Sequence, residues 1–208
     1  METTEHHLIN SFIKQIERMS KQNIEPHSKN WEKVGQWPKT LWETLGSIGA
    51  HGPTVDQQYG GANVGLRAQA LIMEALSYAS PSVGLSYAAH SNLCVNQIHR
   101  FGSHLQCQKW LPDLISGQSV GALAISENDA GSDVLNMRCS FSPSKNGYQL
   151  NGQKSWITNA PVADVIVVYA IDTQRKEPSM TAWIVPTDLD GVEIGTPVQK
   201  IGMKASPT

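Results

Sequence analysis

The sequence lacks the features that mark several large classes of protein. Its only cysteines are Cys94, Cys107 and Cys139, without a C-x-x-C pair, which predicts reduced thiols rather than a disulfide framework. The net charge is −2 and the basic residues form no stripe, so we expect no nucleic-acid partner. No apolar run approaches the roughly 18 residues that a membrane helix needs, so we expect no membrane insertion.

The N-terminal segment METTEHHLIN has neither the basic and apolar regions of a signal peptide nor the Arg/Ser richness of a mitochondrial presequence. Together with the reduced thiols, this predicts a cytoplasmic protein of bacterial type. With 208 residues, 40% of them hydrophobic and 16% charged, the chain is expected to be globular and to form one large or two small domains.

Common catalytic motifs are also missing. Neither glycine-rich phosphate-loop pattern occurs, and Gly60-Gly61 is typical of a plain turn. His90 and Cys94 share a helix face and His99 and His104 follow, but no carboxylate or thiolate pair completes a zinc set, so we expect no metal. There is no G-x-S-x-G elbow and no recognisable Cys–His pair for a nucleophile.

The chain changes character near Ser119, from helical periodicity to strands and tight turns. We therefore expect an all-α domain over 1–119 and a β domain over 120–208. Apolar spacing, N-cap serines, prolines and terminal glycines predict helices near 8–16, 38–46, 66–78, 82–100 and 103–117.

Strand signals begin at Val120, where apolar residues alternate. Asn146-Gly147 and Asn151-Gly152 each predict a two-residue hairpin turn, and the second would set residues 148–150 against 153–155. Continuous apolar runs predict further strands at 165–171 and 181–185.

Two polar segments that follow strand-like runs carry the clearest functional pattern. Leu123–Asp133 (LAISENDAGSD) offers small residues, hydroxyls and free backbone amides, and Trp156-Ile157-Thr158 offers an indole beside a hydroxyl. Such a pair suits a flat ring system with polar edges. Two other interpretations stay open: a strand ending in a Gly-Ser-Asp turn, and a tryptophan packed in the core.

These two segments resemble the flavin-binding motifs of the acyl-CoA dehydrogenase family. The resemblance extends to YGGANVG, Met73-Glu74, KWLPDLISG and the terminal IGMKAS, in the family's order. It implies an α+β fold with an N-terminal α-helical domain followed by a mostly antiparallel β-barrel or sandwich domain. The family's C-terminal four-helix domain would be absent from this chain.

Within the family, the run 83–98 (VGLSYAAHSNLCVNQI) is similar to the isovaleryl-CoA dehydrogenases. The resemblance places Leu85 and Ala89 at positions that shape a pocket for a short branched acyl chain. An i, i+4 pair does lie on one helix face, although both side chains could simply pack against a neighbouring helix.

The resemblance also implies the cofactor, FAD, and the residues around it. Trp156 would pack on the isoalloxazine, Thr158 would donate toward N5, and Ser126 would bind the pyrimidine edge. The full set of implied FAD-binding residues is Leu123, Ile125, Ser126, Gly131, Ser132, Trp156, Ile157 and Thr158. Ser132, Pro178 and Ser179 would contact the coenzyme A part of an acyl-CoA substrate.

The implied reaction is α,β-dehydrogenation, in which a carboxylate removes the α-proton and the β-hydride passes to the flavin. By the family's spacing the catalytic glutamate would lie beyond Thr208, and Glu43, Glu74 and Glu127 occupy other family positions. The resemblance further implies electron-transfer flavoprotein as acceptor and a homotetramer. Two alternatives remain: a flavin oxidase relative, or a truncated remnant or binding module without dehydrogenase activity.

Overall fold

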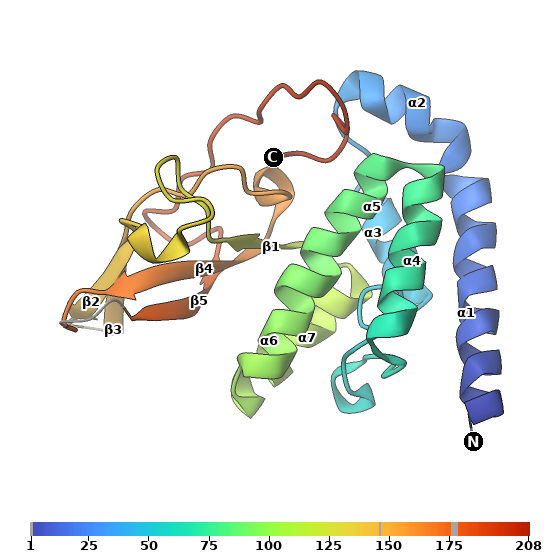
Figure 1. Ribbon diagram of the computed structural model, residues 1–208, viewed down its shortest axis with the longest axis horizontal. Coiled ribbons are helices and arrows are strands. Elements are labelled where there is room, and N and C mark those ends of the chain that lie inside the picture. Colours follow the sequence, from blue (N-terminus) through green and yellow to red (C-terminus); the bar gives the residue numbers. More distant parts are fainter. Residues whose placement is uncertain (1, 146, 176–178) are drawn as a thin grey trace.

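The computed structural model describes residues 2–145, 147–175 and 179–208. A helical part formed by the first half of the chain stands beside a β-sheet formed by the second half (Figure 1). The expected order of a helical domain followed by strands is therefore confirmed. None of the helices within the described ranges is long and apolar enough to cross a membrane.

From α3 onward the helices begin and end close to the residues that the sequence pattern marked, whereas α1 extends well beyond the predicted 8–16 and α2 was not predicted. Ser80 accepts a hydrogen bond from the Val83 N–H at the start of α5, and Ser103 forms a capping box with Gln106 at the start of α7. The predicted helix at 82–100 is one continuous helical run with a π-helical stretch, η2, in its middle. The helical elements are α1 (Glu2–Asn23), α2 (Glu25–Val34), α3 (Thr40–Ser47), η1 (Gln57–Tyr59), α4 (Gly65–Ala79), α5 (Pro81–Ala88), η2 (Ala89–Val95), α6 (Asn96–Phe101) and α7 (His104–Ser116).

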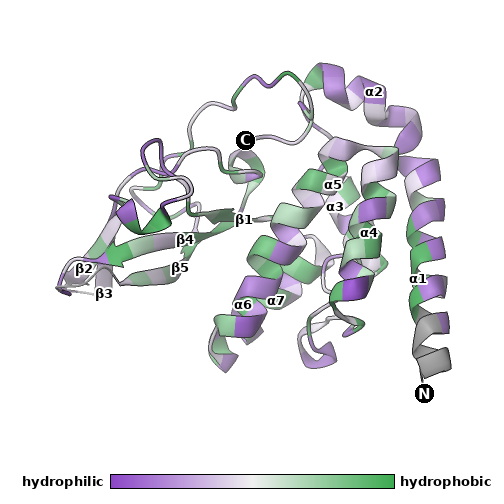
Figure 2. Cartoon of the chain, in the orientation of Figure 1, coloured by the Kyte–Doolittle hydropathy of each residue, from purple (hydrophilic) through white to green (hydrophobic). Residues whose placement is uncertain are grey.

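The helical core forms where apolar stripes of these helices meet. Ile16 of α1 and Ile72 and Leu76 of α4 are fully buried in one cluster. Figure 2 shows the matching pattern, with hydrophilic and hydrophobic residues alternating around α1 and α4. Burial of each such aliphatic side chain contributes about 1.5–3 kcal/mol, so packing rather than local propensity holds these helices together.

The sheet is built around one long strand, β4 (Val165–Asp172). β1 (Gly121–Ala124) and β2 (Ser140–Ser144) pair in parallel with successive parts of β4, and β5 (Met180–Pro186) pairs antiparallel with β4. β3 (Gly147–Asn151) pairs antiparallel with β2. The described strands thus form a mixed sheet, in which the expected antiparallel pairing holds for the two hairpins only.

The predicted second hairpin is wrong. Residues 153–155 form no strand and do not pair with 148–150; instead, the Ser155 N–H donates to the Ser126 carbonyl at 2.9 Å. Gly152 has a φ of +151°, and a Cβ there would lie 2.5 Å from the Cα of Cys139. The close approach to Cys139 explains the glycine and carries the chain past β2 rather than back along β3.

One core joins the helices to the sheet. Val165 and Val167 of β4 belong to the same buried cluster as Cys94 and Val95 of η2 and Leu114 of α7. The opposite face of the sheet has its own small cluster around Ala122, Ala124 and Ile166. The sheet therefore needs the helices on one side, and its first strand is buried on both faces.

A pair of fully buried histidines lies at the junction. His90 Nδ1 accepts the Gly121 N–H at 2.8 Å, so Nε2 carries the ring hydrogen and donates to the Leu114 carbonyl at 2.9 Å. His51 donates from Nε2 to the Trp42 carbonyl at 2.9 Å, and the two imidazole centroids are 4.4 Å apart. Burial lowers the pKa of His51 to about 4, and burial together with His51 lowers the pKa of His90 well below its usual value.

These lowered pKa values predict acid destabilisation. Below pH about 6.5 these histidines are protonated in the unfolded chain but stay neutral in the folded chain. The free energy of unfolding therefore falls as the pH drops toward the folded pKa of about 4. Each such proton contributes up to about 1.4 kcal/mol per pH unit. We expect urea unfolding at stepped pH to show a shallower loss between pH about 6.5 and 5 in His51→Phe than in the original chain. The same change at exposed His7 should leave the slope unaltered; equal slopes in all three proteins would contradict the prediction.

Candidate functional site

Residues 156–159, here called the elbow, form a tight turn between β3 and the short 3₁₀ helix η4 (Ala160–Val162). Trp156 and Asn159 both have left-handed backbone conformations, with φ of 64° and 72°. This conformation is costly for a bulky residue such as Trp156 and persists only where the surroundings enforce it, whereas asparagine tolerates it better. Ile157 helps to hold the turn in place, because its side chain packs on Ala122 and Ala124.

Asn159 also holds the turn in place, through hydrogen bonds of its side chain and backbone. It is fully buried, and its Nδ2 donates to the Ser86 carbonyl at 2.8 Å and to the Gly121 carbonyl at 3.3 Å. Its backbone N–H donates to the Pro207 carbonyl at 2.8 Å. The elbow is thus tied to helix α5, to strand β1 and to the C-terminal tail at once.

The second predicted segment is a long connection from β1 to β2, here called loop 125–139. Glu127 and Ala130 exchange backbone hydrogen bonds at 2.9 and 3.3 Å, which closes a small turn. Gly131 and Ser132 follow on its exposed side, and a Cβ on Gly131 would meet no heavy atom within 4 Å. Within the described part of the chain, the N–H groups of both residues have no hydrogen-bond partner.

An ion pair joins loop 125–139 to the chain that leads into the elbow. Lys154 Nζ lies 2.9 Å from Glu127 Oε1, and only 9% of each side chain is exposed. The Glu127 carboxylate also accepts the N–H groups of Arg138 and Cys139, at 2.7 and 2.9 Å. Burial alone would raise the pKa of Glu127, but these hydrogen bonds and Lys154 lower it, so the carboxylate stays ionised.

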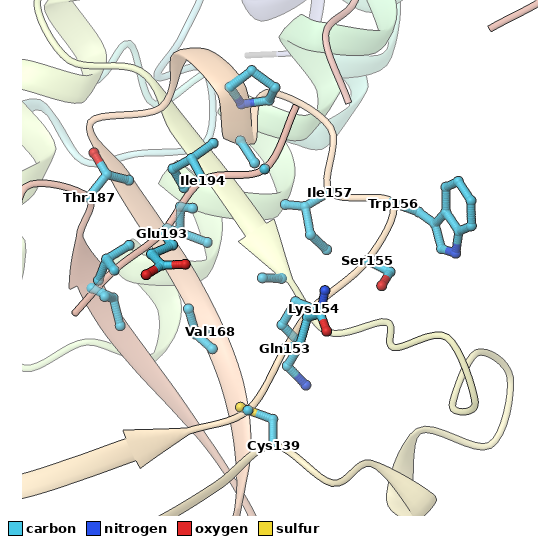
Figure 3. A pocket seen from close by; sticks show the side chains of 18 of the residues that line it. Cys139, Gln153, Lys154, Ser155, Trp156, Ile157, Val168, Thr187, Glu193 and Ile194 are labelled. Carbon is cyan, nitrogen blue, oxygen red and sulfur yellow. The ribbon is translucent and has the colours of Figure 1, made fainter. Parts of the chain in front are cut away.

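The two predicted ring-binding segments therefore do lie side by side. Ser126 and Thr158 are half-buried, and the Trp156 indole is 64% exposed and points away from the sheet (Figure 3). Open N–H groups, hydroxyls and an uncovered indole fit a planar ring with carbonyl groups along one edge, as in a flavin. Leu123 and Ile157 contribute differently, because their side chains pack into the helical and sheet clusters. Ile125 is half-buried, and its carbonyl accepts from Lys154 at 3.0 Å.

Of the five residues that the resemblance assigns to the substrate, Ser132 lies on loop 125–139 and two lie on the helix next to the elbow. Leu85 is half-buried in α5, and Ala89 is buried one turn later, on either side of the Ser86 carbonyl that binds Asn159. Ser179 lies at the far end of β4, where its carbonyl accepts the Asp172 N–H at 2.9 Å. Pro178 lies outside the described residues.

A cavity of about 840 Å³ lies between the sheet and residues 191–198. Its sheet side is formed by Ala124, Ile166 and Val168, and it shares only Trp156 and Ile157 with the predicted flavin residues (Figure 3). Because Ser126, Thr158 and the open N–H groups of Gly131 and Ser132 lie outside its lining, the predicted site is the surface formed by the elbow and loop 125–139 rather than this cavity.

The remaining chemistry-bearing groups are structural. Within the described ranges, no three His, Cys, Asp or Glu side chains are placed to hold a metal ion. Burial raises the pKa of Cys94 to about 12, so its thiol is protonated at neutral pH. Sequence patterns did not single out Lys154 or Asn159, nor a structural role for Glu127, because each acts through a contact distant in sequence.

Comparison with known proteins agrees with this arrangement. The model of the acyl-CoA dehydrogenase N-terminal domain matches residues 4–118, and that of the middle domain matches residues 122–208. The chain belongs to the acyl-CoA dehydrogenase family. The expected family and its class of enzyme are thereby confirmed.

Individual members of the acyl-CoA dehydrogenase family resemble the chain in sequence and in structure. The mitochondrial isovaleryl-CoA dehydrogenase of Arabidopsis thaliana is 43% identical over 95% of this chain and 49% of its own length. The butyryl-CoA dehydrogenase of Megasphaera elsdenii superposes with a TM-score of 0.90 at 28% identity, over 96% of this chain and 53% of that one. A glutaryl-CoA dehydrogenase of Mycobacterium smegmatis solved with FADH2 has a TM-score of 0.89 at 26% identity, over 96% of this chain and 50% of that one. The chain thus spans about half the length of the acyl-CoA dehydrogenases that it matches.

The strained, exposed Trp156 leads to a prediction about stability. Glycine adopts positive φ without steric cost, so Trp156→Gly should relieve strain while removing little buried surface. We expect the free energy of unfolding to stay within about 1 kcal/mol of the original value or to rise. Urea unfolding followed by circular dichroism measures this; a loss of several kcal/mol would show that the indole is a packing residue.

Proposed function

We propose that this chain forms the FAD-holding part of an acyl-CoA dehydrogenase that acts on a short branched acyl-CoA such as isovaleryl-CoA. The proposal is carried by one observation: the elbow and loop 125–139 meet and present hydroxyls, open N–H groups and an exposed indole together. Family membership and the isovaleryl-CoA dehydrogenase relatives support it. We also propose that residues 1–119 and 120–208 are its two domains.

The predicted residues would share the work of holding FAD. The Trp156 indole would cover the ring system, and the Thr158 hydroxyl would donate to the ring nitrogen N5. The Ser126 hydroxyl and the N–H groups of Gly131 and Ser132 would bind its polar edges. Leu123, Ile125 and Ile157 would shape the site through their backbones. Bound FAD would supply the acceptor for a hydride from the substrate's β-carbon.

Leu85 and Ala89 would border the acyl group, since the hydrogen bond from Asn159 to the Ser86 carbonyl keeps their helix beside the elbow. Ser132, Pro178 and Ser179 would contact coenzyme A. β4 spans eight residues, or roughly 25 Å, so a ligand touching both α5 and Ser179 must be long and extended. Coenzyme A thioesters have that shape.

We further propose that the proton-abstracting carboxylate comes from residues outside this chain. Glu127 is unsuited to the role, because its oxygens already accept from Arg138, Cys139 and Lys154. Electron-transfer flavoprotein as acceptor, a homotetramer and a cytoplasmic location complete the proposal. The three free, buried cysteines suit a reducing compartment.

Binding of FAD tests the proposal directly. We expect the purified 208-residue chain to take up added FAD, with quenching of flavin fluorescence and a shifted visible absorption band. Thr158→Val should weaken binding roughly tenfold, because one hydrogen bond to the ring is lost. The matched change at Thr40, exposed at the start of α3, should leave affinity unchanged. A colourless protein that takes up no FAD would instead favour the alternative of a non-binding remnant.

A further inference from the structure

Lys154 joins the chain that leads into the elbow to loop 125–139 through several side-chain contacts. Its ammonium group donates to the Ile125 carbonyl at 3.0 Å and to Glu127 Oε1 at 2.9 Å, and it approaches Met137 Sδ at 3.4 Å. All three partners lie on loop 125–139, whereas Lys154 lies two residues before Trp156. Figure 3 shows Lys154 directly before Ser155 and Trp156, on the chain leading into the elbow.

Glu127 closes loop 125–139 from inside. It lies near the start of the loop, and its carboxylate accepts the N–H groups of Arg138 and Cys139 at the end of the loop. Ser126, Gly131 and Ser132 lie before or within the closed part. The Glu127 carboxylate therefore holds the two ends of the loop together. Lys154 holds the loop against the chain that leads into the elbow.

The burial of this pair makes the contact strong and dependent on both partners. Each side chain is only 9% exposed, so removing one partner leaves a charge in a poorly hydrated place. A second ion pair, between Asp129 and Arg138 at 3.3 Å, spans the same loop, but its side chains are 69% and 83% exposed. Exposed pairs of that kind contribute little, so the loop offers a control of the same charge type.

We propose that Lys154 and Glu127 are positioning residues that hold loop 125–139 and the elbow at the spacing needed to grip one planar ligand. The proposal rests on the proposed FAD site for the identity of that ligand, but not for the contact itself. Neither residue needs to touch the ligand, because both act through the backbone that presents Ser126, Gly131 and Thr158.

Hydrogen–deuterium exchange on the ligand-free chain tests the contact. In Lys154→Met, we expect faster exchange in peptides covering both 125–133 and 155–159, including the Ser155 N–H that binds the Ser126 carbonyl. Exchange in α4 and in the β4–β5 hairpin should stay unchanged. Lys14→Met, at an exposed site in α1, and Asp129→Asn, in the exposed pair, are the matched controls. Faster exchange along the whole chain, or in neither segment, would overturn the proposal.

Titration with FAD then links the contact to binding. Lys154→Met and Glu127→Gln should each weaken FAD binding about tenfold or more, whereas Lys154→Arg should restore most of the affinity. Unchanged affinity despite local loosening would overturn the positioning role. If the original chain binds no FAD, the proposed function fails, while the exchange pattern still decides whether Lys154 joins the two segments.

Discussion

The structure depends most on the buried side chain of Asn159. Its amide group reaches the carbonyls of Ser86 and Gly121, and its backbone N–H reaches Pro207. Helix, sheet and tail are thereby fixed to one turn, and the turn can hold two positive φ values. A buried amide leaves little freedom, because any sliding of these elements would leave unpaired polar groups in the core.

The C-terminal tail completes this arrangement. Glu32 of α2 accepts the N–H groups of Lys204 and Ala205 at 2.9 and 3.4 Å, and the Ser206 hydroxyl lies 2.8 Å from that of Ser86. The tail therefore runs back across the helices to the elbow, as Figure 1 shows. Residues 204–207 thus contact α2, α5 and the elbow together, and the sheet cannot be considered apart from the helices.

Local signals predicted most of the fold and part of the site. Ser103, with Gln106 three residues later, marked the start of α7 correctly, because a capping box is decided within one turn. Asn151-Gly152 carried an equally local hairpin signal that failed, since the Lys154–Glu127 contact draws the following residues toward Ser126. The motifs identified the elbow and the loop, but no pattern in them revealed which residues hold the two together. Those contacts depend on folding of the whole chain.

Trp156 supports the interpretation of this surface in a way independent of any resemblance. A large aromatic side chain that is 64% exposed gains little from burial, and its φ of 64° carries a steric cost. Neither helix–sheet packing nor the elbow's hydrogen bonds need an indole there, since Ile157 and Asn159 make the anchoring contacts. Strain and exposure of this kind support the proposal that Trp156 serves a contact outside this chain. Beside open N–H groups and hydroxyls, the partner that fits is a flat ring with polar edges.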